Sequence, residues 1–176
     1  LPYNYFHQLH PCKLTADSLI AMRTPRIYHP APLVSGGQAD LNDAAANHVD
    51  RVLRLPVGAS LIFFNGAGGE FAATISSIDK RRIVINVGAF HDKEREPPLP
   101  LRLAQGISRG ERMDYTIQKA VELGVSRIMP LFTERCGVHL DGDRLAKRLQ
   151  HWRGVAVGAC EQCGRNRLPE ITPALP

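Results

Sequence analysis

The chain has 176 residues, enough for one or two domains with a hydrophobic core. Its 22 lysines and arginines exceed its 17 acidic residues, which gives a formal net charge of +5. This modest bias, concentrated after residue 98, fits either a phosphate-rich partner or simply a well-solvated surface. The sequence has no apolar run of about 18 residues, so no membrane span is predicted. Its four cysteines are too few for a disulfide scaffold, and we expect a cytoplasmic location.

The first stretch, residues 1–21, shows no pattern that continues downstream. It has neither the basic start nor the unbroken apolar core of a signal peptide. Met22 stands immediately before Arg-Thr-Pro-Arg-Ile-Tyr. We interpret residues 1–21 as a leader of upstream or non-native sequence.

The next part, residues 22–93, carries mostly β-strand signals. Two strand-like stretches flank the glycine-rich turn 65–69, and a third, alternating stretch follows at 82–87. Asp43 is the expected N-cap of a short helix over 44–53. Several short strands and one helix in about 70 residues predict a small β-barrel.

A strand–helix–strand pattern follows. Leucines alternate with other residues over 99–103, which predicts a strand. Ser108 and Glu111 have the spacing of a capping box, and Gly124 is placed to end the helix that they would start. The apolar stretch 125–131 is the second strand. The pattern predicts a βαβ unit with parallel strands and therefore an α/β fold after the barrel.

Two further segments complete the organisation. The charged, proline-containing stretch 94–98 has the composition of an interdomain linker. A long amphipathic helix should start at Asp141 or Asp143 and end at Gly164, and 169–172 should begin a third strand. The helix carries basic residues that fit a solvated face: Arg144, Lys147, Arg148 and Arg153.

Polar residues follow both strands of the predicted βαβ unit. The first loop carries Arg109 and Arg112, and the second carries Glu134 and Arg135. Because the carboxyl ends of parallel strands share one edge, we expect these residues to lie close together. Arg165 closes the later helix, either as a cap of the last carbonyls or as a substrate contact. Simple βαβ geometry places it at the opposite edge.

Three separated motifs carry a resemblance to a known family. They are Ser-Arg-Gly-Glu-Arg-Met-Asp-Tyr-Thr-Ile-Gln-Lys-Ala-Val-Glu-Leu-Gly-Val, then Glu-Arg-Cys-Gly-Val, then Glu-Gln-Cys-Gly-Arg-Asn-Arg-Leu-Pro-Glu-Ile. In this order they resemble the bacterial 16S rRNA (uracil-N3) methyltransferases, the ribosomal RNA small subunit methyltransferase E family of the knotted SPOUT superfamily. The match runs from Met22 to the end of the chain.

The resemblance implies a PUA-like RNA-binding barrel over 22–93 and the first part of a SPOUT-type α/β methyltransferase domain over 99–176. It also implies a homodimer that methylates N3 of a uridine in 16S rRNA of the small ribosomal subunit, with S-adenosylmethionine as the cofactor. The family holds this cofactor in a knotted region that we expect beyond Pro176. We therefore expect no cofactor-binding residue in this chain, and no activity from it alone.

The implied reaction suggests roles for the candidate residues. Removing the N3 proton leaves negative charge on the base, which Arg109, Arg135 or Arg165 would stabilise. Glu134 is the nearest candidate base. The candidate RNA contacts are Arg23, Arg26, Arg51, Arg54 and Arg112, although each also fits an ordinary surface position.

Two alternatives remain open. One is an RNA-binding module without enzymatic activity. The other is a zinc-stabilised nucleic-acid adaptor, because Cys136 with His139 and Cys160 with Cys163 form two pairs with zinc-ligand spacing. Cys160 also continues the apolar face of the long helix, which disfavours zinc. Our preferred interpretation has no metal ligand in the chain.

Overall fold

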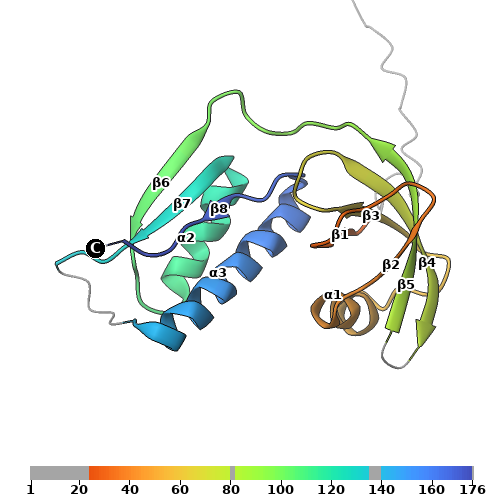
Figure 1. The fold of residues 1–176 in the computed structure, drawn as a ribbon, viewed down its shortest axis with the longest axis horizontal. Coiled ribbons are helices and arrows are strands. Elements are labelled where there is room, and N and C mark those ends of the chain that lie inside the picture. Colours follow the sequence, from red (N-terminus) through yellow and green to blue (C-terminus); the bar gives the residue numbers. More distant parts are fainter. Residues whose placement is uncertain (1–23, 80–81, 135–139, 176) are drawn as a thin grey trace, which may run out of the picture.

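The computed structural model describes residues 24–79, 82–134 and 140–175. These residues form two β-sheets. One sheet is accompanied by a short helix, and the other, in the α/β part, is accompanied by two longer helices (Figure 1). The first sheet has five strands in the order β1-β3-β4-β5-β2, and the second has three in the order β6-β7-β8.

The first sheet forms the predicted β-rich part. Its strands are β1 (Arg26–Tyr28), β2 (Gln38–Asp40), β3 (Ser60–Phe64), β4 (Glu70–Asp79) and β5 (Arg82–His91). β3 and β4 are antiparallel around the glycine-rich turn, and β4 continues antiparallel into β5. Alternate side chains, such as those of Ile75 and Ile85, are buried in the core. The predicted hairpin and the strand after it are confirmed.

A short helix packs against this sheet at the predicted position. It consists of α1 (Asp43–Asn47) and one π-helical segment, η2 (His48–Val52). The N-cap is Asn42, whose side-chain oxygen accepts a hydrogen bond of 2.9 Å from the Ala45 N–H. The prediction of Asp43 as the cap is therefore wrong by one residue. Asp43 instead lies in the first turn, where its charge favours the helix dipole.

The second part has the predicted βαβ order. β6 (Leu101–Gly106) and β7 (Val125–Leu131) are parallel, with α2 (Glu111–Glu122) between them. The long helix α3 (Gly142–Cys163) follows, and β8 (Glu170–Ile171) pairs in parallel with β7. Gly124 and Gly164 have φ values of 88° and 89°, so both helices end in the left-handed conformation predicted for glycine.

The start of α2 differs from the predicted capping box. Its N-cap is Gly110, with φ 59° and ψ −139°, and no side chain forms a cap hydrogen bond there. Ser108 is therefore not the N-cap, and Glu111 is the first helical residue rather than the third, where a capping box requires it. The first N–H groups of α2 consequently lack the side-chain acceptor that the sequence predicted.

The two parts share buried contacts as well as a connecting segment. One core is formed by the strands of the first sheet and the short helix packed on it. The other lies between α2, α3 and the second sheet, around Trp152. Phe64 of β3 belongs to this second core, and Tyr28 of β1 packs against it. The arched arrangement in Figure 1 is thus held by apolar side chains that cross from one part to the other.

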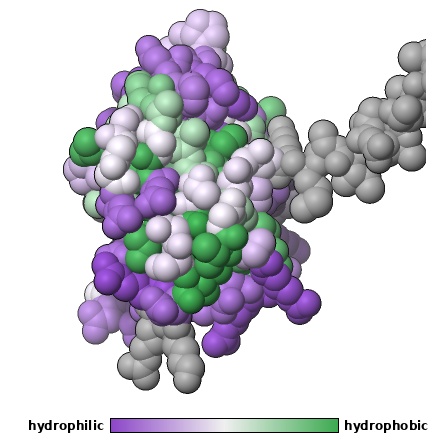
Figure 2. Space-filling view, turned by 90° about the vertical axis from the view of Figure 1, so that its right-hand side faces the viewer, coloured by the Kyte–Doolittle hydropathy of each residue, from purple (hydrophilic) through white to green (hydrophobic). Residues whose placement is uncertain are grey.

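On the face shown in Figure 2, green groups gather below the centre and in smaller groups above it, with white and purple groups between and around them. Exposed apolar side chains of the β-rich part are Val34, Val52, Val57 and Phe90. Among the helices of the described residues, none has the length and apolarity needed to cross a membrane.

Candidate functional site

The carboxyl ends of β6 and β7 lie at one edge of the second sheet, as parallel pairing requires. Arg109 follows β6, Arg112 lies in the first turn of α2, and Glu134 follows β7. All three residues are exposed. Arg135 lies outside the described residues. Three of the four residues expected at this edge are therefore placed there by the described topology.

A cavity of about 190 Å³ opens at the same edge. It is lined by residues 107–110 in the loop after β6 and by Leu140, Arg148 and Trp152. Arg148 and Trp152 are four residues apart on α3, so they share one face of the helix. The sequence analysis placed Arg148 on a solvated face. Its spacing from the only tryptophan is the signal that would have identified it as a cavity residue.

One residue that lines the cavity has an unused hydrogen-bond donor. The Trp152 side chain is buried, and its Nε1–H has no hydrogen-bond partner. A buried donor left unpaired costs the fold about 1–3 kcal/mol. No carboxylate is among the described residues that line the cavity. The site is therefore suited to a negatively charged group that accepts hydrogen bonds.

Arg165 lies at the other end of the sheet. Its guanidinium donates hydrogen bonds of 2.9 Å to the carbonyl oxygens of Val121 and Val125, and it forms an ion pair with Glu96. Val125 begins β7 and Glu134 follows its far end, a separation of about 20 Å along the strand. The catalytic assignment of Arg165 is therefore corrected. Arg165 is a buried structural group that caps the end of α2.

Arg26 also differs from its predicted role. Its Nη1 donates to a carboxylate oxygen of Glu70 at 2.6 Å, and its Nη2 donates to the side chain of Asn166. The guanidinium carbon lies 4.9 Å from the centre of the Phe64 ring, and the side chain is only 8% exposed. These contacts keep it away from an RNA phosphate. The assignment of Arg26 to RNA binding is therefore corrected: Arg26 forms hydrogen bonds that connect the two parts.

Glu70 is the buried anion with which Arg26 pairs where the two parts meet. Its carboxylate lies 2.6 Å from Arg26, 2.8 Å from Lys93 and 3.8 Å from Arg95. Burial raises the pKa of Glu70, but hydrogen bonds from Lys93 and Arg26 outweigh that effect and lower the pKa to about 2. Sequence reasoning missed Glu70, because nothing local distinguishes it from an ordinary strand residue.

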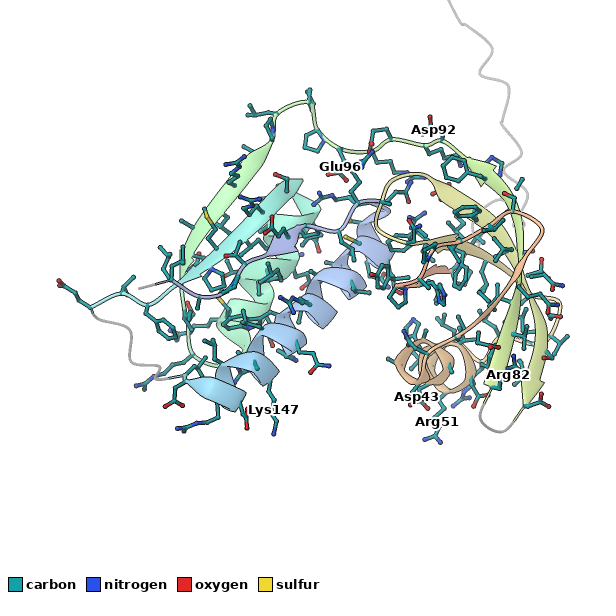
Figure 3. All side chains as sticks on the ribbon, viewed as in Figure 1. Asp43, Arg51, Arg82, Asp92, Glu96 and Lys147 are labelled. Atoms are coloured by element: carbon teal, nitrogen blue, oxygen red, sulfur yellow. The ribbon has the colours of Figure 1, made fainter. Side chains whose placement is uncertain are left out.

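The predicted linker is also held in place where the two parts meet. Glu94 accepts a hydrogen bond of 2.8 Å from Arg167, and Glu96 pairs with Arg165. The side-chain amide of Asn166 donates to the Lys93 carbonyl at 2.8 Å. Figure 3 shows Glu96 on the segment that connects the two sheets, above the end of α3. We call these contacts between the two parts the seam. Its residues are Arg26, Glu70, Lys93, Glu94, Glu96, Arg165, Asn166 and Arg167.

The remaining candidate RNA contacts lie elsewhere. Arg51 and Arg54 are exposed, in and just after η2, whereas Arg23 lies outside the described residues. Arg51 and Lys147 both extend toward the lower side of the molecule in Figure 3. The two arginines thus remain available for an external partner.

The described cysteines do not favour the zinc alternative. Cys160 is fully buried, and burial raises the pKa of its thiol to about 12. Cys136 and His139 lie outside the described residues, so the four-ligand set is not tested as a whole. Within the described ranges, no group of three or more potential ligands is close enough to hold a metal.

The edge cavity does not suit S-adenosylmethionine. The edge cavity is smaller than the roughly 300–1,000 Å³ of typical cofactor pockets, and its two arginines would repel the sulfonium charge. Two larger hollows, of about 410 and 550 Å³, lie on the β-rich part away from this edge.

Family models match both parts of the chain. An RNA methyltransferase PUA domain matches residues 41–88, and an RNA methyltransferase domain matches residues 95–176. Ribosomal RNA small subunit methyltransferase E of Buchnera aphidicola (subspecies Schizaphis graminum) is 36% identical over 85% of this chain and 61% of that protein. The Bacillus subtilis protein of the same name is 29% identical over 71% of this chain and 49% of that protein.

Two solved structures agree with these matches. A putative methyltransferase from Legionella pneumophila with bound SAM has a TM-score of 0.84 and 44% identity, over 87% of this chain and 64% of that chain. Ribosomal RNA small subunit methyltransferase E from Neisseria gonorrhoeae, also bound to S-adenosylmethionine, has a TM-score of 0.83 and 40% identity, over 87% and 63%.

The matches confirm the predicted fold class, a PUA-like part followed by a SPOUT-type α/β methyltransferase part. The chain spans about three fifths of the length of the first curated relatives that it matches. By sequence, order of parts and fold, the chain belongs to the ribosomal RNA small subunit methyltransferase E family.

Proposed function

We propose that the whole protein methylates N3 of a uridine in 16S rRNA, with S-adenosylmethionine as the methyl donor. The supporting observation is the match of an RNA methyltransferase PUA domain and an RNA methyltransferase domain in a single chain. Similar structures at 44% and 40% identity have S-adenosylmethionine bound. We further propose a cytoplasmic homodimer that acts on 16S rRNA or the small ribosomal subunit.

The edge of the second sheet is the proposed reaction side of this chain. N3 of uridine carries a proton in neutral water, so methylation needs a base and a group that stabilises negative charge on the ring. Glu134 is the proposed base, and Arg109 the proposed cation. Their support is their position after neighbouring parallel strands. Arg135 is proposed as a second cation.

The β-rich part and the start of α2 are the proposed RNA-gripping surfaces. Arg51, Arg54 and Arg112 are exposed and available to phosphates. A base inside folded RNA must be unstacked before it reacts, which favours a separate surface that holds the surrounding strand. We propose that the cofactor is held mainly by residues other than those described, because the edge cavity is small and cationic.

The test is methyl transfer by the full-length protein. Small ribosomal subunits that lack the modification are incubated with labelled S-adenosylmethionine, and the nucleosides are then separated by mass spectrometry. We expect 3-methyluridine as the product. Glu134→Gln and Arg109→Gln should each lower the rate by about 10²-fold or more, whereas the exposed control Arg153→Gln should not. RNA binding without transfer would favour the non-enzymatic module instead.

A further inference from the structure

We propose that the cavity between the loop after β6 and the first part of α3 binds a phosphate group of the RNA backbone. The juxtaposition of Arg109, Arg148, the buried Trp152 Nε1–H and the uncapped start of α2 carries this inference. It rests on the proposed RNA substrate but requires nothing about the methyl-transfer step. Of these groups, Arg148 and Trp152 have no part in the function proposed above.

The charges around the cavity favour an anion. Two guanidinium side chains line it, and none of its described lining residues is acidic. Two acids at the helices beside the cavity are engaged in other pairs: Asp114 lies 2.7 Å from the His151 ring nitrogen, and Asp141 lies 3.2 Å from Arg144. Glu134, at the same edge, is not among the residues that line the cavity. Arg148 has no ion-pair partner among the residues that the structure describes. A phosphate would supply the missing counter-charge.

The start of α2 adds backbone donors. The helix is 12 residues long, and no side chain forms a cap hydrogen bond at its start. Helix N-termini favour anions through these N–H groups and the helix dipole. Gly110 has a positive φ, and a Cβ built there would meet no atom within 4 Å. The backbone at this point is therefore open to a ligand.

Trp152 supplies an independent indication of a ligand. Its side chain is 1% exposed and lines the cavity, yet its indole N–H has no acceptor. A phosphate has several acceptor oxygens and can accept from an indole, a guanidinium and a helix N-terminus together. The cavity volume of about 190 Å³ suits such a group better than a whole nucleoside cofactor.

The experiment uses the fluorescence of Trp152, the only tryptophan of the chain. Inorganic phosphate is titrated into the 176-residue chain in a phosphate-free buffer at low ionic strength. We expect a saturable change in tryptophan emission. Arg148→Gln and Arg109→Gln should each weaken phosphate binding by several-fold to about tenfold. Arg153→Gln, on the same helix but not lining the cavity, should leave the titration unchanged.

A short single-stranded RNA then distinguishes a backbone phosphate from a free anion. We expect the RNA to produce the same fluorescence change and to compete with phosphate. In Arg148→Gln this competition should no longer be observed. The inference is overturned if no saturable change occurs, if Arg148→Gln binds phosphate like the wild type, or if RNA does not compete. Because no methyl transfer is measured, failure of the proposed enzyme activity would leave this result intact.

Discussion

The seam between the two sheets and the far edge of the second sheet use the same residue type in opposite ways. At the seam, Arg26 and Arg165 are buried and paired with Glu70 and Glu96. At the opposite edge, Arg109 and Arg148 line a cavity that contains no acidic side chain. The comparison shows that a surplus of arginines does not measure RNA-binding surface. The carboxylates that face an arginine determine which of the two roles it can have.

The physical basis is desolvation. A guanidinium is taken out of water at the seam because carboxylates and carbonyls replace its hydration, and removing any one partner leaves a buried charge uncompensated. Arg148, which lines the edge cavity, forms no ion pair with the residues that the structure describes and can pair with a ligand. Substitutions at the seam should therefore change the free energy of unfolding, whereas substitutions at the edge should change binding.

The largest expected effect is at Arg165. Arg165→Ala leaves Glu96 and the carbonyls of Val121 and Val125 without their donor. We expect a loss of about 3–5 kcal/mol in the free energy of unfolding, measured by urea denaturation. Arg153→Ala, an exposed change on the helix before it, is the control. A loss no larger than that of the control would contradict the structural role of Arg165.

The acid sensitivity of the seam is the second expectation. The carboxyl of Glu70 has a pKa lowered from 4.5 to about 2, so its contribution is present above pH 4.5 and is lost as the pH falls toward 2. The shift corresponds to about 3 kcal/mol. Unfolding curves at several pH values should show wild type losing this stability between pH 4.5 and 2, whereas Glu70→Gln has already lost it at pH 7. If the free energy of unfolding fell equally with pH in both proteins, ionisation of Glu70 would not stabilise the fold.

A smaller effect is expected on the β-rich part. Arg51→Ala combined with Arg54→Ala should weaken RNA binding and reduce its salt dependence, because both side chains are exposed. Each lost phosphate contact reduces the slope of log K against log salt by about 0.7 for single strands. Filter binding at several salt concentrations measures the slope. An unchanged slope would make these arginines ordinary surface residues.

The smallest expected effect is at Lys119. Its Nζ lies 2.7 Å from a carboxylate oxygen of Glu122 on α2. Such exposed pairs contribute little to stability. Lys119→Gln should therefore leave urea unfolding unchanged within error, and a clear loss would show that exposed pairs in this protein act like those of the seam.

The sequence predicted the local elements well, because their signals are local. The βαβ order and the glycines that end α2 and α3 follow from residue periodicity and from the left-handed conformation at Gly124 and Gly164. The helix starts were less predictable. Ser108 with Glu111 has the right spacing for a capping box, but Gly110 intervenes as the actual N-cap.

The seam was beyond sequence reasoning for a different reason. Arg26 and Asn166 bond across 140 positions, and Arg165 and Glu96 across 69. No periodicity or motif links residues so far apart. The sequence therefore predicts only an RNA contact or an ordinary surface position for Arg26, and a helix cap or a substrate contact for Arg165. At the edge, the topological argument for Arg109 and Glu134 needed only parallel strands, and the structure has them.

The most direct test of the contrast between seam and edge is the salt dependence of RNA binding by a charge-matched pair of double variants. One variant carries Arg109→Gln and Arg148→Gln at the edge cavity, and the other carries Arg102→Gln and Arg153→Gln at exposed positions outside it. Because both edge arginines are assigned to one phosphate, the slope of log K against log salt should fall by about 0.7 in the first variant only. Equal slopes in the two variants would contradict the assignment of the edge cavity to RNA.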